Sequence, residues 1–350
     1  MRTHIAKGLK VVLFFAVGII ILLLVYQRQD KAYKAECALK GISNTDCSLI
    51  DKIMLDISNA NYGWLILIMI FFMITNIIRA LRWKMMFKAI GYSPSMLNLF
   101  GTVMINYLAN LGVPRSGEVI RAGLLSNYED IPLEKVLGTI FTDRIFDVIM
   151  LFIVIVLAMF FGGSEFITYL NDNIDLSSKI NSFLSHPVLV ISVILLSIIS
   201  LWLVWKNRSK ALESRVGKKI RSLFVGFSDG VQSVRGVSSI PLFIFYTVAI
   251  WVLYYLMTYL AFFSFTATSG LGPIAGLVVF VFGSLGIVIP TPGGMGSYHY
   301  LVGEGLALYG VNGIDAFSFA NIVFFSINIF INILFGLAAL IYLPLYNKER

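Results

Sequence analysis

Long apolar runs recur along this chain, and their length decides what it can fold into. About 20 apolar residues cross the hydrocarbon core of a bilayer as a helix. The runs that we interpret as full spans cover residues 11–26, 62–78, 137–161, 187–205, 240–265 and 316–344. A soluble core could not enclose a chain that is 58% hydrophobic and only 13% charged. We therefore expect an all-α polytopic membrane protein with about six full transmembrane helices.

Two further apolar regions are interrupted in the middle. The region 96–125 contains LGVPRSGE, and the region 271–309 contains IPTPGGMGS. Proline removes a helix donor and glycine permits unusual backbone, so each region is expected to form two half-helices joined by irregular backbone. We interpret both as re-entrant hairpins, which gives eight or more membrane segments, because 113–125 and 297–309 are too short to cross comfortably. Counting each half-helix as a full span fits the charged loops equally well and is the alternative. The loop residues that would form these breaks are Pro114, Gly117, Pro290, Pro292, Gly293, Gly294 and Gly296.

The two breaks resemble each other in sequence. VPRSGEVIRA (113–122) and IPTPGGMGSY (289–298) both carry Pro-x-x-Gly at the same offset. Paired interrupted segments that enter from opposite faces are typical of transporters built from an inverted repeat, with the binding site near the midplane. An inverted repeat is therefore one hypothesis, and a chance match of a short motif is the other.

The charges between the spans predict orientation. The loop 206–239 carries eight Lys or Arg residues and two acidic ones, whereas the loop 162–186 is mainly acidic. The positive-inside rule places the first loop in the cytoplasm and the second outside. Both termini are then cytoplasmic, and so is the basic cluster Arg79, Arg82, Lys84 and Lys88 that follows the span 62–78.

The first polar loop, 27–61, is extracytoplasmic in this arrangement and contains both cysteines, Cys37 and Cys47. Because that compartment is oxidising, we expect them to form a disulfide. The whole chain, 1–350, is expected to be a single integral membrane domain.

The first break carries charge into the apolar region. Arg115, Glu118 and Arg121 lie within seven residues of one another, and Ser116 could cap the second half-helix. The simpler interpretation is a capped helix start with an ion pair between Glu118 and Arg121. The functional interpretation is a helix N-terminus with two guanidinium groups, which suits a phosphate.

More ionisable residues follow in apolar surroundings. Asp143 and Asp147 share a helix face, with Arg144 three residues before Asp147. They could neutralise one another or the arginines of the first break, or they could set the charge of a cavity or carry a proton. Glu304 shares a face with Ser297 in the short half-helix after the second break, and either binds substrate or extends to the outer interface.

Several functions lack a sequence signature here. There is no phosphate-binding loop, no H-E-x-x-H and no G-x-S-x-G. The three histidines are scattered and no C-x-x-C pair is present, so we expect no metal site and no cofactor. The net charge of +8 is concentrated in short loops between spans, which indicates membrane orientation and not a nucleic-acid partner.

Three motifs together resemble the lysylphosphatidylglycerol synthase transmembrane family: VPRSGEVIRAGLLS, TDRIFDVIMLFIV and PTPGGMGSYHYLV. The resemblance extends from about residue 60 to 345 and is closest to small stand-alone members. It implies a cavity for a lipid headgroup. The positions that match the family pattern are Pro114, Arg115, Gly117, Glu118, Arg121, Asp143, Arg144, Asp147, Pro292, Gly293, Gly294 and Gly296. Ser116 departs from the small apolar residue of many relatives.

The resemblance implies a lipid translocase in the bacterial inner membrane that moves a phospholipid or a polyprenyl-phosphate-linked lipid between leaflets. The chain leaves no room for a soluble aminoacyltransferase domain, so we expect no enzyme activity. A transporter of a small anion and an accessory subunit of a lipid-modifying synthase are the alternatives. The expected partners are a lipid with an anionic headgroup and either further copies of the chain or a separate lipid-modifying enzyme.

Overall fold

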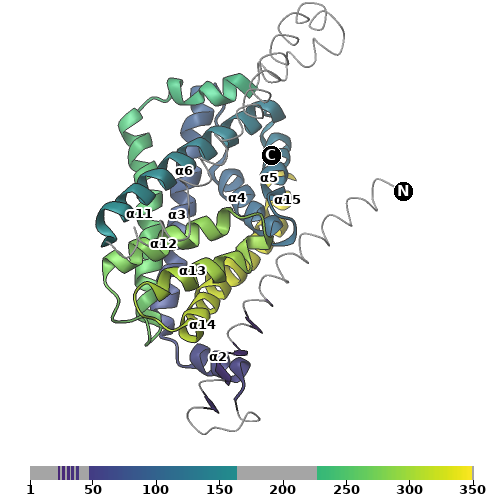
Figure 1. Cartoon of the computed structure of the whole chain (residues 1–350). Coiled ribbons are helices and arrows are strands. Elements are labelled where there is room, and N and C mark those ends of the chain that lie inside the picture. The colour runs from purple at the N-terminus through teal and green to yellow at the C-terminus, as the bar shows by residue number, and fades with distance from the viewer. Residues whose placement is uncertain are drawn as a thin grey trace, which may run out of the picture.

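A computed structural model describes residues 47–163 and 227–348, together with a few residues between Leu23 and Ala38. These residues form helices and turns, and no strand occurs among them. The elements are α2 (Leu49–Ser58), α3 (Tyr62–Ala89), α4 (Met96–Gly112), α5 (Ser116–Glu129), α6 (Leu133–Phe161), η1 (Ser233–Gly236), α11 (Ile240–Ala261), η2 (Phe262–Ser264), α12 (Pro273–Val288), η3 (Pro292–Gly294), α13 (Ser297–Ala307), α14 (Gly313–Phe324), η4 (Phe325–Ile331) and α15 (Asn332–Lys348) (Figure 1).

Four of the expected spans fall in the described ranges, and each is a helix long and apolar enough to cross a membrane. They are Tyr62–Ala89, Leu133–Phe161, Ile240–Ser264 and Gly313–Lys348. The prediction of an all-helical membrane protein is therefore confirmed. Nearly all of the expected span 11–26, the span 187–205, and most of the loops 162–186 and 206–239 lie outside the described residues.

The expected end of the second span is wrong. The apolar run stops at residue 78, but α3 continues without interruption to Ala89. Arg79 and Arg82 therefore lie inside the helix, where they are only 3% and 0% exposed. They are not part of a solvated basic cluster, because side chains on other helices pair with their charges.

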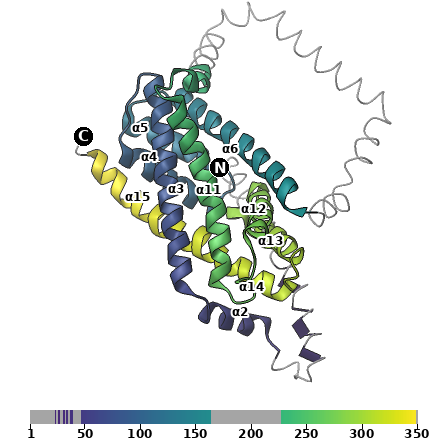
Figure 2. The same cartoon turned by 90° about the vertical axis from the view of Figure 1, so that its left-hand side faces the viewer.

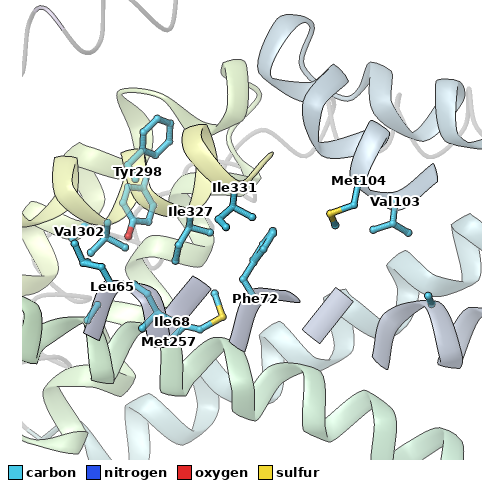
Figure 3. Close-up of a cluster of buried hydrophobic side chains, with 14 of the residues drawn as sticks. Leu65, Ile68, Phe72, Val103, Met104, Met257, Tyr298, Val302, Ile327 and Ile331 are labelled. Atoms are coloured by element: carbon cyan, nitrogen blue, oxygen red, sulfur yellow. The ribbon is translucent and has the colours of Figure 1, made fainter. Parts of the chain in front are cut away.

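Helix α3 is the centre of the fold. It packs side by side with α11, and α4 and the π-helical segment η4 also contact it (Figure 2). Leu65, Ile68 and Phe72 project from α3 into a buried apolar cluster that includes side chains of α4, α11, α13 and η4 (Figure 3). This packing fixes α3 relative to both interrupted regions of the chain.

The first interrupted region is a helical hairpin of α4 and α5, as the sequence predicts. At the open end, the backbone N–H of Ser95 donates to Glu129 Oε1 at 2.8 Å. At the closed end, a Cβ atom on Gly117 would lie 2.2 Å from the carbonyl oxygen of Asn106. The two helices approach so closely there that only a glycine fits.

The second interrupted region is a hairpin of α12 and α13. Its connection contains Gly293, Gly294 and Gly296 with φ of 58°, 86° and 81°, a region that other residues rarely adopt. The hydroxyl of Ser297 donates to the carbonyl of Gly286 at 2.7 Å and so joins the start of α13 to α12. The glycines of IPTPGGMGS therefore serve the turn itself.

A pair of glycine substitutions in α5 tests the close packing of the first hairpin. Gly117→Ala should destabilise the protein by about 1–3 kcal/mol, because the new methyl group collides with backbone. Gly123→Ala is the matched control, since nothing lies within 4 Å of its Cβ position. It should be neutral or stabilising. Thermal unfolding in detergent measures both, and equal losses of stability would contradict the hairpin geometry.

Candidate functional site: a buried arginine–aspartate cluster beside two broken helices

The two breaks lie next to each other. Arg115 in the first break donates from Nη2 to the carbonyl oxygen of Val288, the last residue of α12, at 3.0 Å. A Cβ atom on Gly293 in the second break would lie 2.8 Å from the Leu111 side chain near the end of α4. Segments almost 180 residues apart in sequence thus form one irregular region. A guanidinium group beside a helix C-terminus is also favourable, because that end carries partial negative charge.

The expected role of Ser116 as a helix cap is wrong. Residue Arg115 occupies the N-cap position with a left-handed φ of 61°, and its side chain makes no capping bond. The Ser116 hydroxyl instead donates to the carbonyl of Val113 at 2.8 Å. Asn110 of α4 supplies the cap, because its Oδ1 accepts from the backbone N–H of Gly117 at 2.8 Å. The cap of α5 therefore comes from the neighbouring helix.

Two aspartates of α6 bind two arginines of α3 in the interior. Arg79 Nη1 donates to Asp143 Oδ2 at 2.9 Å and to Asp147 Oδ2 at 3.0 Å. Arg82 Nη2 donates to Asp143 Oδ1 and, at 3.2 Å, to Asp147 Oδ1. Thr247 of α11 also accepts from Arg82, at 3.2 Å. Such pairing offsets the cost of removing these charges from water.

Arg121 of α5 approaches the same group but is left without hydrogen bonds. Its guanidinium carbon lies 4.1 Å from the ring centroid of Trp83, a stacking distance that favours a cation. The indole of Trp83 is fixed by a 2.9 Å bond from Nε1 to Thr139 Oγ1. Arg121 is 1% exposed, its nearest acid is Asp143 at 3.9 Å, and none of its three nitrogens has a hydrogen-bond partner among the described residues.

The cluster becomes more exposed toward Arg144 and Glu118. Arg144 Nη1 lies 3.3 Å from Asp147 Oδ2, and its Nε lies 4.0 Å from Glu118 Oε1. The side chains of Arg144 and Glu118 are 40% and 27% exposed, whereas Asp147 is 14% exposed. The cluster therefore has a buried end at Arg121 and an accessible end at Arg144. The expected ion pair between Glu118 and Arg121 is replaced by the contact between Glu118 and Arg144.

We call this group the arginine–aspartate cluster. It comprises Arg79, Arg82, Glu118, Arg121, Asp143, Arg144 and Asp147. The four arginines outnumber the three carboxylates by one, so the cluster carries a net positive charge and unused donors, which suit an anionic group. Within the described ranges, no three His, Cys, Asp or Glu side chains are grouped in a way that could hold a metal ion.

The structure brings together most of the residues singled out from the sequence, and it adds two. Arg79 and Arg82 were assigned to orientation alone, although their spacing of three residues puts them on one helix face, as the spacing of four residues does for Asp143 and Asp147. Glu304 lies partly buried in α13, which packs against α12 and α14, and its role in substrate binding stays a prediction.

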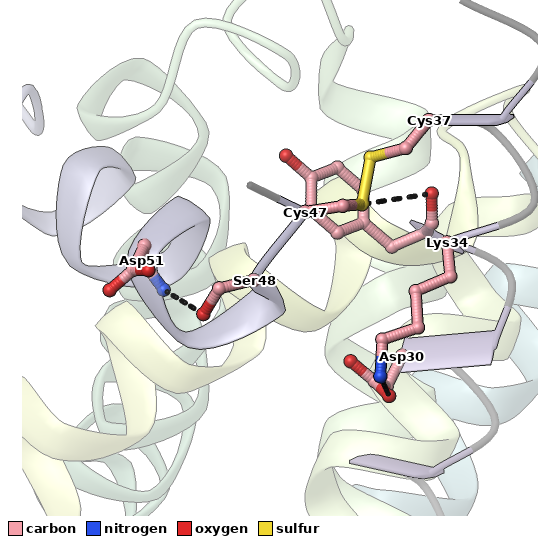
Figure 4. The surroundings of a disulfide bond; sticks show 7 residues. Asp30, Lys34, Cys37, Cys47, Ser48 and Asp51 are labelled. Atoms are coloured by element: carbon pink, nitrogen blue, oxygen red, sulfur yellow. Dashed lines mark hydrogen bonds and ion pairs between the residues drawn. A yellow bond between two sulfur atoms is a disulfide. The ribbon is translucent and has the colours of Figure 1, made fainter. Parts of the chain in front are cut away.

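The two cysteines are joined in the extracytoplasmic loop predicted for residues 27–61. Cys37 and Cys47 form a disulfide with their Cα atoms 6.3 Å apart, and Cys47 Sγ lies 3.6 Å from the carbonyl of Tyr33 (Figure 4). The crosslink is adjacent to Ser48, which caps α2 by accepting from the backbone N–H of Asp51 at 3.3 Å. It therefore anchors the start of α2.

Apolar spans, interrupted hairpins and a buried charged cluster together define a multi-pass membrane protein. The family described as "Lysylphosphatidylglycerol synthase TM region" matches residues 43–336. The chain therefore belongs to the lysylphosphatidylglycerol synthase transmembrane family. The match includes both breaks and every member of the arginine–aspartate cluster.

A curated relative supports the same assignment. The UPF0104 membrane protein MJ1595 of Methanocaldococcus jannaschii is 31% identical over 127 residues, which cover 35% of this chain and 38% of that protein. The chain thus matches well under half of the relative's length. No solved structure matches this chain.

Asp143 is expected to be the residue on which the cluster's stability depends most. Asp143→Asn removes the charge that faces three buried arginines and should destabilise the protein by about 3–5 kcal/mol. Asp229→Asn is the matched control, because Asp229 is half exposed and its ion pair with Lys135 is long, at 4.0 Å. Thermal unfolding of both variants in detergent measures the difference. A small effect at Asp143 would contradict its central role.

Proposed function

We propose that this protein moves a lipid with an anionic headgroup between the two leaflets of the membrane, and that the arginine–aspartate cluster binds the headgroup. The observation that carries the proposal is Arg121, whose guanidinium is buried and has no hydrogen-bond partner in the part of the chain that the structure describes. Leaving a buried charged donor unsatisfied is costly, so such a group is expected to meet an anion during function. A phosphate group, in a phospholipid or a polyprenyl-phosphate-linked lipid, supplies the missing acceptors.

The accessible end of the cluster suggests an entry route. A headgroup would first meet Arg144 and Glu118, which are partly exposed, and then Arg121. The two hairpins would be re-entrant, the first from the cytoplasm and the second from outside, related as an inverted repeat. The contact between Arg115 and Val288 joins their breaks and would close the region between them. This arrangement fits a bacterial inner-membrane protein with both termini in the cytoplasm.

The proposal predicts that Arg121 is needed for lipid transfer. In proteoliposomes with fluorescent phosphatidylglycerol, the intact protein should make inner-leaflet lipid accessible to a membrane-impermeant quencher. Arg121→Gln should abolish most of this transfer, because it removes the unpaired charge. Arg235→Gln, at an exposed arginine outside the cluster, should transfer at the normal rate.

Folding and the rival function are checked in the same preparation. Size-exclusion profiles and unfolding temperatures should show that Arg121→Gln is folded. Lipid transfer that survives in the folded variant would refute the proposed role. The cationic site also suits a small soluble anion, so uptake of radioactive phosphate without lipid transfer would favour that function instead.

A further inference from the structure

Helix α2 packs one side against α14 and exposes large apolar side chains on the other. On one side, Leu49 and Ile53 pack with Ile314 and Phe317 of α14. The charged Lys52 also faces the protein, since it binds Asp56 at 2.8 Å and Asp315 of α14 at 2.7 Å. The apolar contacts and the ion pairs therefore both hold α2 against the body of the molecule.

The ion pairs of Lys52 help to set the orientation of the helix. Burial disfavours the charged ammonium, but the hydrogen bonds to Asp315 and Asp56 outweigh it and raise the pKa of Lys52 above its usual value. Together with the apolar contacts to α14, these ion pairs define the rotation of α2 about its axis. That rotation decides which side chains point away from the protein.

Large apolar side chains cover the other side of α2. Ile50, Met54 and Leu55 are 54%, 62% and 59% exposed. In water this would be unfavourable, because burying each such side chain is worth about 1.5–3 kcal/mol. The polar side chains of Asp51 and Ser58 lie on the same side. A surface with both polar and apolar side chains suits the lipid headgroup layer.

The end of α2 is tied to the ends of two spans. Three residues separate Ser58 from Tyr62, so the two helix ends are at most about 14 Å apart. The Tyr62 hydroxyl donates to the carbonyl of Ile57 at 2.8 Å. The backbone N–H of Asn61 donates to the carbonyl oxygen of Ser264, just after α11, at 2.9 Å. Helix α2 cannot move far from the start of α3 and the end of α11.

Aromatic residues mark that point as the membrane boundary. Trp64 of α3 pairs with Phe263 of η2 at 5.0 Å between ring centroids, and Tyr255 stacks on Tyr259 of α11 at 6.2 Å. Trp and Tyr collect at the level of the lipid headgroups. Helix α2 runs across the end of α3 at this level and not along it (Figure 2).

We propose that α2 lies in the membrane surface, with Ile50, Met54 and Leu55 inserted among the lipids of the leaflet at this end of α3. An amphipathic helix binds a lipid surface in this orientation. The occupant is the bilayer, because the tether, the aromatic boundary and the outward apolar side all place the helix there. The proposal concerns a lipid contact that holds whatever the protein transports.

Spin labelling in proteoliposomes tests the proposal. Met54→Cys carries a nitroxide in the full-length protein, whose native cysteines are joined in a disulfide. Collisions with oxygen, which concentrates in lipid, are compared with collisions with a nickel chelate, which stays in water. Labels at Phe152, 67% exposed on α6, and at the half-exposed Asp229 provide the lipid and water references.

The expected result is a several-fold higher oxygen-to-nickel ratio at Met54 than at Asp229, approaching that at Phe152. Ile50→Cys repeats the measurement at a second position on the same side. Nickel accessibility equal to that at Asp229 for both labels would overturn the proposal. Dipolar broadening that disappears on dilution with unlabelled protein would overturn it as well, because a second copy would then cover α2.

Discussion

The pairing of Asp143 with buried arginines is the interaction on which the interior depends. A guanidinium group inside a membrane protein is tolerated only opposite a compensating charge. Asp143 is hydrogen-bonded to Arg79 and Arg82 and lies within 3.9 Å of Arg121. One carboxylate thereby links α3, α5 and α6 to one another.

That constraint explains why short, interrupted helices can exist beside it. Half-helices such as α5 and α13 leave backbone groups unsatisfied at their ends, and lipid cannot satisfy them. Asn110 caps α5 from α4, and Ser297 joins α13 to α12. Arg115 then joins the first break to the second through Val288. These contacts join the irregular backbone to neighbouring helices, and it lies beside the helices that carry the charged cluster.

The rest of the molecule positions these parts within a membrane. Helices α3, α6 and α11 are long and apolar enough to cross the bilayer. The apolar cluster around Phe72 packs both hairpins against α3. At one end, the disulfide and the ion pair of Lys52 hold α2 against α14. The anchored helix α2 lies at one end of α3, and the positively charged arginine–aspartate cluster lies further along the same helix.

The sequence by itself determined four of the spans, the two helical hairpins and the family, because apolar length, Pro-Gly breaks and short motifs are local properties. Pro114 and Gly293 marked the turns correctly for this reason. Only the tertiary structure decided the partners of the charges. Arg79 and Arg82 follow an apolar run, so hydropathy averaged over a short window places the end of a span there. In the structure they bind aspartates more than 60 residues away. The cap that Asn110 provides for α5 likewise depends on which helices pack together, and the hydropathy of the sequence does not contain that information.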